Sequence, residues 1–441
     1  MSPAPETHVF AEPILRHADV VVIGGGIVGS ATAYFLAKRG ARVALVEKGE
    51  LSGEQSGRNW GWIRQQGRNP RELPLAMLSL ATWAELAREL DPDTEWAQAG
   101  SLRLAYDEET MAKYERWTRM ARELGLDTHV LSAREVERLI PALQGSYLGG
   151  AYTPSDAQME PRVTTTAVAR AAQKLGAMIY AGCAVEGLEV GSGALTRVLT
   201  ERGPIKTSMV VCAAGAWSSK IGRMVGLDLP QRWVRATVAR TSVVKPVTRT
   251  LVWAEGVAIR QRRDGSINLA EGGGDHDVTL ETFRHFWAFL PNYRRNRKNL
   301  RLHVGVELWK DLTRTLPWSS AKKHPFAHAV GNEPPPNRPV VERTRKSLLK
   351  LIPTLGDVSI ERVWAGIIDA TPDGVPVLGE VPELKGFLFA TGFSGHGFAL
   401  GPGAGRIIAE LVLDGKASLD VQPLRYARFR EQDQADWTQT I

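Results

Sequence analysis

The start of this chain combines a strand, a glycine-rich turn, a helix and a second strand. An apolar run meets the pattern G-x-G-x-x-G at Gly24, Gly26 and Gly29, a helical pattern follows, and a second apolar run ends at Glu47. In such a unit the helix N-terminus holds a dinucleotide pyrophosphate, and an acid about 20 residues later binds a ribose hydroxyl. The sequence therefore predicts a Rossmann-like domain, and Glu47 disfavours the 2′-phosphate of NADP.

A second glycine-rich segment lies near the other end of the chain. Residues 390–398 read ATGFSGHGF, and the glycines of 401–405 lead into another apolar run. Glycine lets the backbone approach a ligand closely, and a helix N-terminus favours negative charge. This segment has no acid-ended strand of its own, so we expect both ends of the chain to hold one dinucleotide. We place the N-terminus of the second helix at residues 403–405.

Composition narrows the class of protein. The chain has 441 residues, 43% hydrophobic and 23% charged, which predicts a globular protein of two domains. A net charge of +7 without a basic stripe does not indicate nucleic acid. No leader peptide or membrane-length apolar run is visible, so we expect a cytoplasmic protein. Cys183 and Cys212 indicate two buried thiols, with neither a disulfide framework nor a metal site.

The pattern of strands indicates an interleaved α/β fold. Residues 207–215 form one continuous apolar run, as in a parallel sheet covered on both faces. Residues 234–244 and 251–270 alternate apolar and polar positions, as in an antiparallel sheet. We expect a discontinuous dinucleotide-binding domain, an α+β substrate domain built on an antiparallel sheet, and a C-terminal tail. The expected bounds are 17–92, 145–228 and 340–420 for the first, 93–144 and 229–339 for the second, and 421–441 for the tail.

Several motifs resemble one family of flavoenzymes. Residues 392–398 are similar to the flavin-proximal motif of monomeric sarcosine oxidases, and 364–366, 371–374 and 56–59 also match. From about residue 19 to 415, the chain resembles the D-amino-acid oxidase and sarcosine oxidase superfamily. The resemblance implies FAD held across two interleaved domains. Sarcosine oxidases attach the flavin through a cysteine close to positions 365–368, where this chain has neither Cys nor His, so non-covalent FAD is expected.

The expected FAD contacts lie in these motifs and in the strands beside them. They are Gly24, Gly26, Ile27, Val28, Gly29, Glu47, Lys48, Ser56, Asn59, Gly61, Trp62, Val185, Ala214, Gly215, Trp217, Gly366, Gly395, His396, Gly397 and Phe398.

The substrate-binding residues of the family are matched only in part by this chain. Arg64 matches the early arginine that binds a carboxylate in the family, although a structural ion pair or a flavin contact would also explain it. Arg260 is a second candidate for binding the carboxylate, although an exposed arginine at the end of a strand would explain it equally well. His396 is a candidate for tuning the flavin or orienting the substrate. The Lys that follows the glycine motif in sarcosine oxidases is Ala399 here.

The expected reaction is FAD-dependent oxidation of the C–N bond of an amino acid or N-alkyl amino acid. The alternatives are a 2-hydroxy acid or glycerol-phosphate dehydrogenase, and a flavoprotein subunit of a hetero-oligomeric dehydrogenase. The electron acceptor is oxygen or a quinone. The oxygen-activating Lys of the family is absent from 266–270, where Asn268 is the inward polar candidate, which favours a dehydrogenase unless a protonated His396 substitutes. The basic segment 294–301 is either a solvated helix end or a peripheral membrane or subunit contact.

Overall fold

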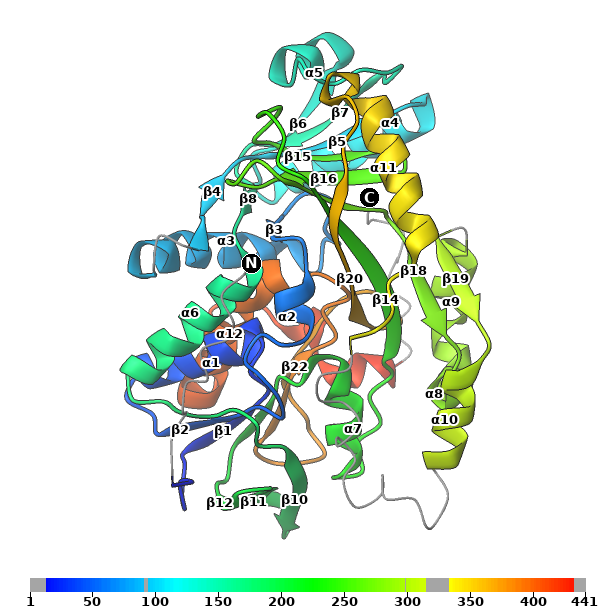
Figure 1. Cartoon of the computed structure of the whole chain (residues 1–441). Helices are drawn as coiled ribbons and strands as arrows, with labels where there is room; N and C mark the ends of the chain where they lie inside the picture. The colour runs from blue at the N-terminus through cyan, green and yellow to red at the C-terminus, as the bar shows by residue number, and fades with distance from the viewer. Residues whose placement is uncertain (1–12, 91–93, 298, 315–332, 432–441) are drawn as a thin grey trace.

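A six-stranded sheet forms the lower half of the molecule in Figure 1. The computed structural model describes residues 13–90, 94–297, 299–314 and 333–431. The strand order is β21-β22-β13-β1-β2-β9, and every pair is parallel except β21 with β22. The strands are β1 (Val20–Ile23), β2 (Val43–Val46), β9 (Met178–Tyr180), β13 (Val210–Cys212), β21 (Val377–Glu380) and β22 (Phe387–Thr391). This confirms the predicted Rossmann-like sheet. The first glycine motif follows β1 and the second follows β22, and only β13 lies between these two strands.

The two faces of this sheet are covered differently. Helices pack on one face, whereas a three-stranded sheet and a short helix pack on the other. The first group is α1 (Ile27–Lys38), α6 (Pro161–Lys174) and α12 (Gly397–Asp414), with α3 (Leu73–Glu89) against α12. The second group is β10 (Val185–Gly191), β11 (Ala194–Thr200), β12 (Gly203–Lys206) and α7 (Ser218–Arg223). Because both faces are covered, the central strands are apolar along their whole length.

Helix α12 begins earlier than the sequence indicates. Its first residue is Gly397, so residues 403–405 lie inside the helix, and the predicted N-terminus there is wrong. The glycines serve helix packing instead. A Cβ at Gly403 would lie 2.8 Å from the Cβ of Ser79 on α3, and one at Gly405 would lie 2.6 Å from the backbone nitrogen of Thr32 on α1. Glycine is needed there because the three helices are in close contact.

A ten-stranded mixed sheet forms the rest of the core and lies above the first in Figure 1. Its order is β19-β18-β14-β17-β16-β15-β5-β7-β6, and β20 pairs with the other edge of β14. The predicted antiparallel pairing is confirmed for the pairs β14/β17, β17/β16 and β16/β15, and β15 runs parallel to β5. The strands are β5 (Ser101–Ala105), β6 (His129–Ser132), β7 (Gly149–Thr153), β14 (Arg232–Thr241), β15 (Leu251–Ala254), β16 (Val257–Gln261), β17 (Ile267–Ala270), β18 (Gly274–Asp277), β19 (Leu300–His303) and β20 (Ile360–Ala370).

The remaining elements surround this sheet or connect it to the first. Helix α11 covers one face of β16 and β17, and the short strands β3, β8 and β4 form a small sheet between the two large ones. Their bounds are β3 (Trp62–Ile63), β4 (Ala97–Gln98), β8 (Ala157–Gln158), α2 (Gln55–Arg58), α4 (Glu108–Glu123), α5 (Ala133–Leu139), α8 (Leu280–Arg284), α9 (Phe286–Asn296), α10 (Val306–Arg314) and α11 (Arg338–Leu351).

The strand pairing differs from the expected domain bounds at two places. Strand β7 lies within 145–228, yet it pairs with β5 and β6. Helix α11 and strand β20 lie within 340–420, yet α11 packs on the large sheet and β20 pairs with β14. Both strands connect the two sheets along the chain, and an apolar pattern does not reveal which sheet such a strand will join.

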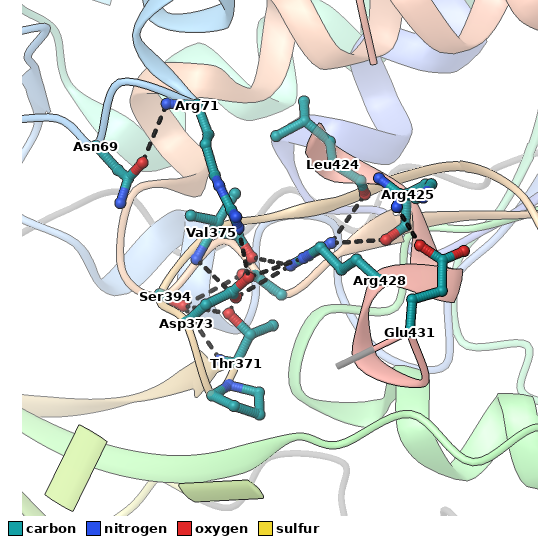
Figure 2. A network of polar contacts seen from close by, with 12 residues as sticks. Asn69, Arg71, Thr371, Asp373, Val375, Ser394, Leu424, Arg425, Arg428 and Glu431 are labelled. Atoms are coloured by element: carbon teal, nitrogen blue, oxygen red, sulfur yellow. Dashed lines mark hydrogen bonds and ion pairs between the residues drawn. The ribbon is translucent and has the colours of Figure 1, made fainter. Parts of the chain in front are cut away.

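The C-terminal segment up to residue 431 is packed against the core and is not a free tail. Leu424 and Tyr426 are fully buried, and the guanidinium group of Arg428 pairs with Asp373 at 2.8 Å (Figure 2). Arg428 also donates to the carbonyl oxygens of Leu424 and Val375. Residues 421–431 of the expected C-terminal tail are therefore packed on the core, and residues 432–441 lie outside the described part of the chain.

Replacing Arg428 by methionine is expected to destabilise the fold by about 3–5 kcal/mol, because the buried carboxylate of Asp373 loses its main partner. The matched control is Arg430→Met, which removes an exposed pair with Glu383 and should change stability by less than about 1 kcal/mol. Urea unfolding of both variants gives the comparison. Equal stabilities would show that the Arg428–Asp373 pair does not fasten this segment.

Candidate active site

A cavity of about 1350 Å³, its open mouth included, lies between the two large sheets. The carboxyl ends of β1, β2 and β13 line one side, and β14 and β20 of the mixed sheet line the other. Ligands of open parallel sheets bind outside the carboxyl ends of the strands, where connecting loops diverge. The cavity is therefore placed where both glycine motifs can contact a single ligand.

The first glycine motif forms a narrow cradle at the N-terminus of α1. The backbone nitrogen of Ile27 donates to Ser56 Oγ at 2.9 Å, and a Cβ at Gly26 would lie 3.0 Å from the same oxygen. Gly24 has φ +114°, and a Cβ there would lie 2.4 Å from the carbonyl oxygen of Ala213. A Cβ at Gly29 would lie 1.9 Å from the carbonyl oxygen of Gly24, so this third glycine permits the helix to approach the strand. The three glycines thus have the separate steric roles of a dinucleotide motif.

Glu47 is held at the end of β2 by backbone donors. Its Oε2 accepts from the nitrogen of Gly25 at 2.7 Å, and its Oε1 accepts from the nitrogen of Gly49 at 2.8 Å. Burial raises the pKa of Glu47, and these two bonds oppose that shift. A carboxylate oxygen has more than one lone pair, so Glu47 can still accept from a ribose hydroxyl in the cavity that it lines.

Gln55 and Asp369 connect three segments around the middle of the cavity. Gln55 Oε1 accepts from the nitrogen of Ala216 at 2.9 Å, and its Nε2 donates to Asp369 Oδ1 at 2.7 Å. Asp369 Oδ2 in turn accepts from the nitrogen of Gly392 at 2.8 Å. Gln55 was not among the residues predicted from the sequence, because a lone glutamine carries no local signal for such long-range contacts.

Most of the predicted FAD contacts line this cavity. The lining omits Gly29, Gly61, Trp62 and His396. It includes the other predicted positions, which are Gly24, Gly26, Ile27, Val28, Glu47, Lys48, Ser56, Asn59, Val185, Ala214, Gly215, Trp217, Gly366, Gly395, Gly397 and Phe398. It also includes positions that the motifs did not indicate, among them Gln55, Arg58, Trp60, Ala236, Val238 and Asp369.

Arg64 is partly buried beside Trp253, which packs on the cavity-lining Trp60, and one of its guanidinium nitrogens lacks a hydrogen-bond partner. Its Nη1 is buried and makes no hydrogen bond, and its Cζ lies 5.9 Å from the ring centroid of Trp253. Burial, together with the charges of Arg68 and Arg103, lowers the pKa of Arg64 well below its ordinary value. A buried guanidinium with an unused donor is stabilised by an anionic ligand.

Arg260 is engaged by the protein itself. Its side chain is only 1% exposed, and it pairs with Glu160 at 2.8 Å, donates to Gln158 at 2.7 Å and donates to the carbonyl oxygen of Trp60 at 2.9 Å. The alternative that Arg260 is an exposed strand end does not hold, because the side chain is buried. With these donors already used, the geometry does not support Arg260 as a second residue for a substrate carboxylate.

His396 connects the N-termini of two helices. It is the N-cap residue of α12, and its Nδ1 lies 3.1 Å from a carboxylate oxygen of Glu72, the N-cap residue of α3. Burial, followed by the charge of Arg68, lowers the pKa of His396 to about 4. The imidazole is therefore neutral at pH 7, so a protonated His396 does not supply the cation considered from the sequence.

Because the pKa of His396 is about 4, its ionisation should not appear in the activity profile above pH 5.5. The profile of kcat/KM between pH 5.5 and 9 should keep its shape in His396→Asn, whatever the change in absolute rate. A break near pH 6.5 that the variant lacks would contradict the neutral imidazole.

Comparison with known proteins assigns the family. The model of the DAO family, which is described as "FAD dependent oxidoreductase", matches residues 19–411. The chain belongs to this family. As a family member it is an FAD-dependent oxidoreductase, and its cavity fits that cofactor: glycines form the cradle at the α1 N-terminus, and Glu47 lies beside it.

Several proteins similar to this chain are named as enzymes of amino acids. Sarcosine dehydrogenase from Mus musculus is 29% identical over 95% of this chain, which spans 42% of that enzyme's length. Glycine oxidase from Geobacillus kaustophilus is 27% identical over 93% of this chain and 97% of its own. The structure of L-amino acid deaminase from Proteus myxofaciens in complex with anthranilate is 28% identical, with a TM-score of 0.90 over 95% of both chains.

Two further properties concern the described part of the chain. No helix in it is both long and apolar enough to cross a bilayer. Within the same residues, no group of three or more His, Cys, Asp or Glu side chains is arranged to hold a metal ion.

Proposed function

We propose that this chain oxidises the C–N bond of an amino acid or N-alkyl amino acid to an imine, which water hydrolyses to an oxo acid or aldehyde. The observation that carries the proposal is the buried Nη1 of Arg64, which has no hydrogen-bond partner. Arg64 contacts Trp253, and Trp253 packs on Trp60, a residue of the cavity lining. The names of the relatives support it, since sarcosine dehydrogenase, glycine oxidase and L-amino acid deaminase are all enzymes of amino acids. Bound FAD would supply the hydride acceptor for the carbon beside the nitrogen.

The residues around the cavity bind and orient the substrate in this proposal. Arg64 holds the carboxylate, which fixes the distance from the substrate's α-carbon to the cavity. Glu72 holds His396 in place, while burial and the charge of Arg68 keep the imidazole neutral against the opposing effect of the Glu72 carboxylate. No side chain here needs to accept a proton if the amine binds unprotonated. FAD is held without a covalent bond in this proposal, since no cysteine, histidine or tyrosine is among the described residues that line the cavity.

Product analysis tests the proposal. The FAD-loaded protein is incubated with D-, L- and N-methyl amino acids and an artificial dye, and the oxo acid or aldehyde and the released amine are measured. One equivalent of each per dye reduced is expected with at least one substrate. Turnover with 2-hydroxy acids or glycerol phosphate and none with amino acids would favour the alternative dehydrogenase. Absence of any turnover, with a second protein co-purifying at fixed stoichiometry, would favour a subunit role.

We propose a quinone or dye rather than oxygen as the electron acceptor. In β17, the position expected for an oxygen-activating lysine holds Asn268, whose Nδ2 lies 3.5 Å from the carbonyl oxygen of Trp60. A cation near the flavin would stabilise developing superoxide, and no cation stands in this strand. Rapid-mixing of the reduced enzyme with air-saturated buffer should give slow reoxidation. Fast reoxidation with one equivalent of peroxide would overturn this proposal.

We also propose that the surface around 294–301 contacts an anionic membrane. Trp287 of α9 is 79% exposed and Trp309 of α10 is 71% exposed, and Arg294, Arg295 and Arg297 lie at the end of α9; Lys298 is outside the described residues. Exposed aromatic and basic side chains together favour a membrane surface. Sedimentation with phosphatidylglycerol vesicles should be lost in Trp287→Ser. Equal sedimentation of both proteins would contradict the contact, and binding to a protein subunit instead would identify the other partner.

A further inference from the structure

Three tryptophans form one continuous wall that begins at the FAD cavity. The ring centroids of Trp60 and Trp62 are 5.2 Å apart, those of Trp60 and Trp253 are 5.8 Å apart, and those of Trp62 and Trp253 are 6.1 Å apart. Trp60 lines the cavity, and each of the three keeps part of its surface accessible. We call these three residues the tryptophan wall. The wall extends from the cavity toward Arg64.

Strand register brings Trp253 and Arg103 to the side of the sheet that faces the cavity. Val238 lines the cavity, and Val238, Ala270, Ala258, Trp253 and Arg103 are paired in that order across five neighbouring strands. Residues in register on neighbouring strands share one face of a sheet. The wall and the second arginine therefore lie on the face that covers the cofactor.

Two guanidinium groups contact the same indole. The Cζ of Arg103 lies 4.8 Å and that of Arg64 lies 5.9 Å from the centroid of Trp253. Arginine stacks on indole faces, which holds both partners in fixed orientations. Arg64 thus places its unpartnered Nη1 next to an aromatic surface.

The geometry of the wall does not suit an N-methylated ammonium group. An aromatic cage holds such a cation between separated ring faces. Here the rings contact one another, with centroids no more than 6.1 Å apart, and the two guanidinium groups on Trp253 would repel a further cation. The rings are inclined to one another by 35° to 75°, so the wall offers apolar ring faces and edges that an aromatic group can contact in stacked or edge-to-face geometry.

The charges around Arg64 match a single carboxylate. The groups that act on it electrostatically are Arg68, Arg103, Asp156 and Glu72, and with Arg64 they comprise three cations and two carboxylates. Burial raises the pKa of Asp156, and hydrogen bonds from the backbone nitrogens of Gln65 and Gln66 and from the Ser101 hydroxyl oppose that shift. With both carboxylates ionised, one net positive charge remains. A substrate with a second carboxylate would leave that second charge without a partner.

We propose that this site selects amino acids that carry one carboxylate and an aromatic side chain. The inference rests on the proposed function, because it assigns the substrate class of the same reaction. The carboxylate binds Arg64, and the side chain stacks on the tryptophan wall. Arg103 is a positioning residue, because it contacts Trp253 and fixes the plane of its ring. The α-carbon then lies toward Trp60 and the cavity.

A substrate comparison tests the proposal. Anaerobic flavin reduction is followed with both enantiomers of phenylalanine, alanine and aspartate, and with glycine and sarcosine. For the reactive enantiomer, kcat/KM should be at least ~10- to 100-fold higher for phenylalanine than for alanine, and aspartate should be poorest. Reduction by alanine, glycine or sarcosine at an equal or higher rate would overturn the aromatic class. Failure of every amino acid would instead overturn the proposed function itself.

Variants of the wall separate stacking from a general loss of structure. Trp253→Leu should lower kcat/KM for phenylalanine at least ~10-fold and change that for alanine less than about 3-fold. Trp253→Phe should restore most of the loss, and Trp309→Leu, on exposed α10, should change neither substrate. A binding measurement that needs no turnover uses benzoate and acetate, whose effects on the flavin absorbance should differ in the wild type and converge in Trp253→Leu. Equal losses for both substrates and both ligands would overturn the role of the wall.

Discussion

Replacing Arg64 by methionine is expected to raise the half-saturating substrate concentration by ~30- to 5000-fold. The reason is that a charged pair in a desolvated site contributes roughly 2–5 kcal/mol to binding. Arg64 is suited to this role because its buried Nη1 has no protein partner. Methionine keeps most of the side-chain volume, so the pocket should retain its shape.

The control for this variant is Arg362→Met, on the exposed end of β20, which should change neither substrate nor FAD binding. Flavin content is measured in parallel from the absorbance ratio of the purified proteins. Normal kinetics in Arg64→Met would show that the carboxylate binds elsewhere. Loss of flavin from this variant would show that Arg64 holds the cofactor.

Replacing Gly26 by valine is expected to weaken FAD binding by at least ~100-fold. A Cβ at this position would lie 3.0 Å from Ser56 Oγ, at the N-terminus of α1, where backbone donors face the cavity. Losing two hydrogen bonds to a charged group costs about 3–6 kcal/mol, which is more than 100-fold in affinity. The dissociation constant is measured by quenching of FAD fluorescence with the apoprotein.

The matched control is Gly305→Ala, since nothing lies within 4 Å of a Cβ there and the residue is exposed. It should bind FAD as the wild type does. Equal affinity in Gly26→Val would contradict the cradle at α1.

The sequence predicts the dinucleotide sheet well because its signal is local. Gly24, Gly26, Gly29 and Glu47 lie within one βαβ unit, so their spacing alone places them at the N-terminus of α1. The first residue of α12 is harder to predict from the sequence. The glycines at 401–405 suggest a ligand loop, yet they are buried against α1 and α3, and helix packing gives the same pattern as close approach to a ligand.

The substrate side is harder to predict because its contacts join distant segments. Arg260 pairs with Glu160 and Gln158, about 100 residues earlier, so the sequence could not show that its donors are used. Arg103 and Trp253 meet only through the pairing of β5 with β15. An arginine inside the apolar strand Ser101–Ala105 was the one local signal that could have drawn attention to Arg103.

Anaerobic titration of the FAD-loaded protein with an amino acid and with its 2-hydroxy analogue distinguishes oxidation at a C–N bond from oxidation at a C–O bond. The pair differs only in the nitrogen that the proposed reaction requires, whereas Arg64 can bind the carboxylate of either. We predict that about one equivalent of the amino acid per site bleaches the flavin absorbance band at ~450 nm. The hydroxy acid should leave the flavin oxidised. Bleaching by the hydroxy acid alone would contradict oxidation at a C–N bond.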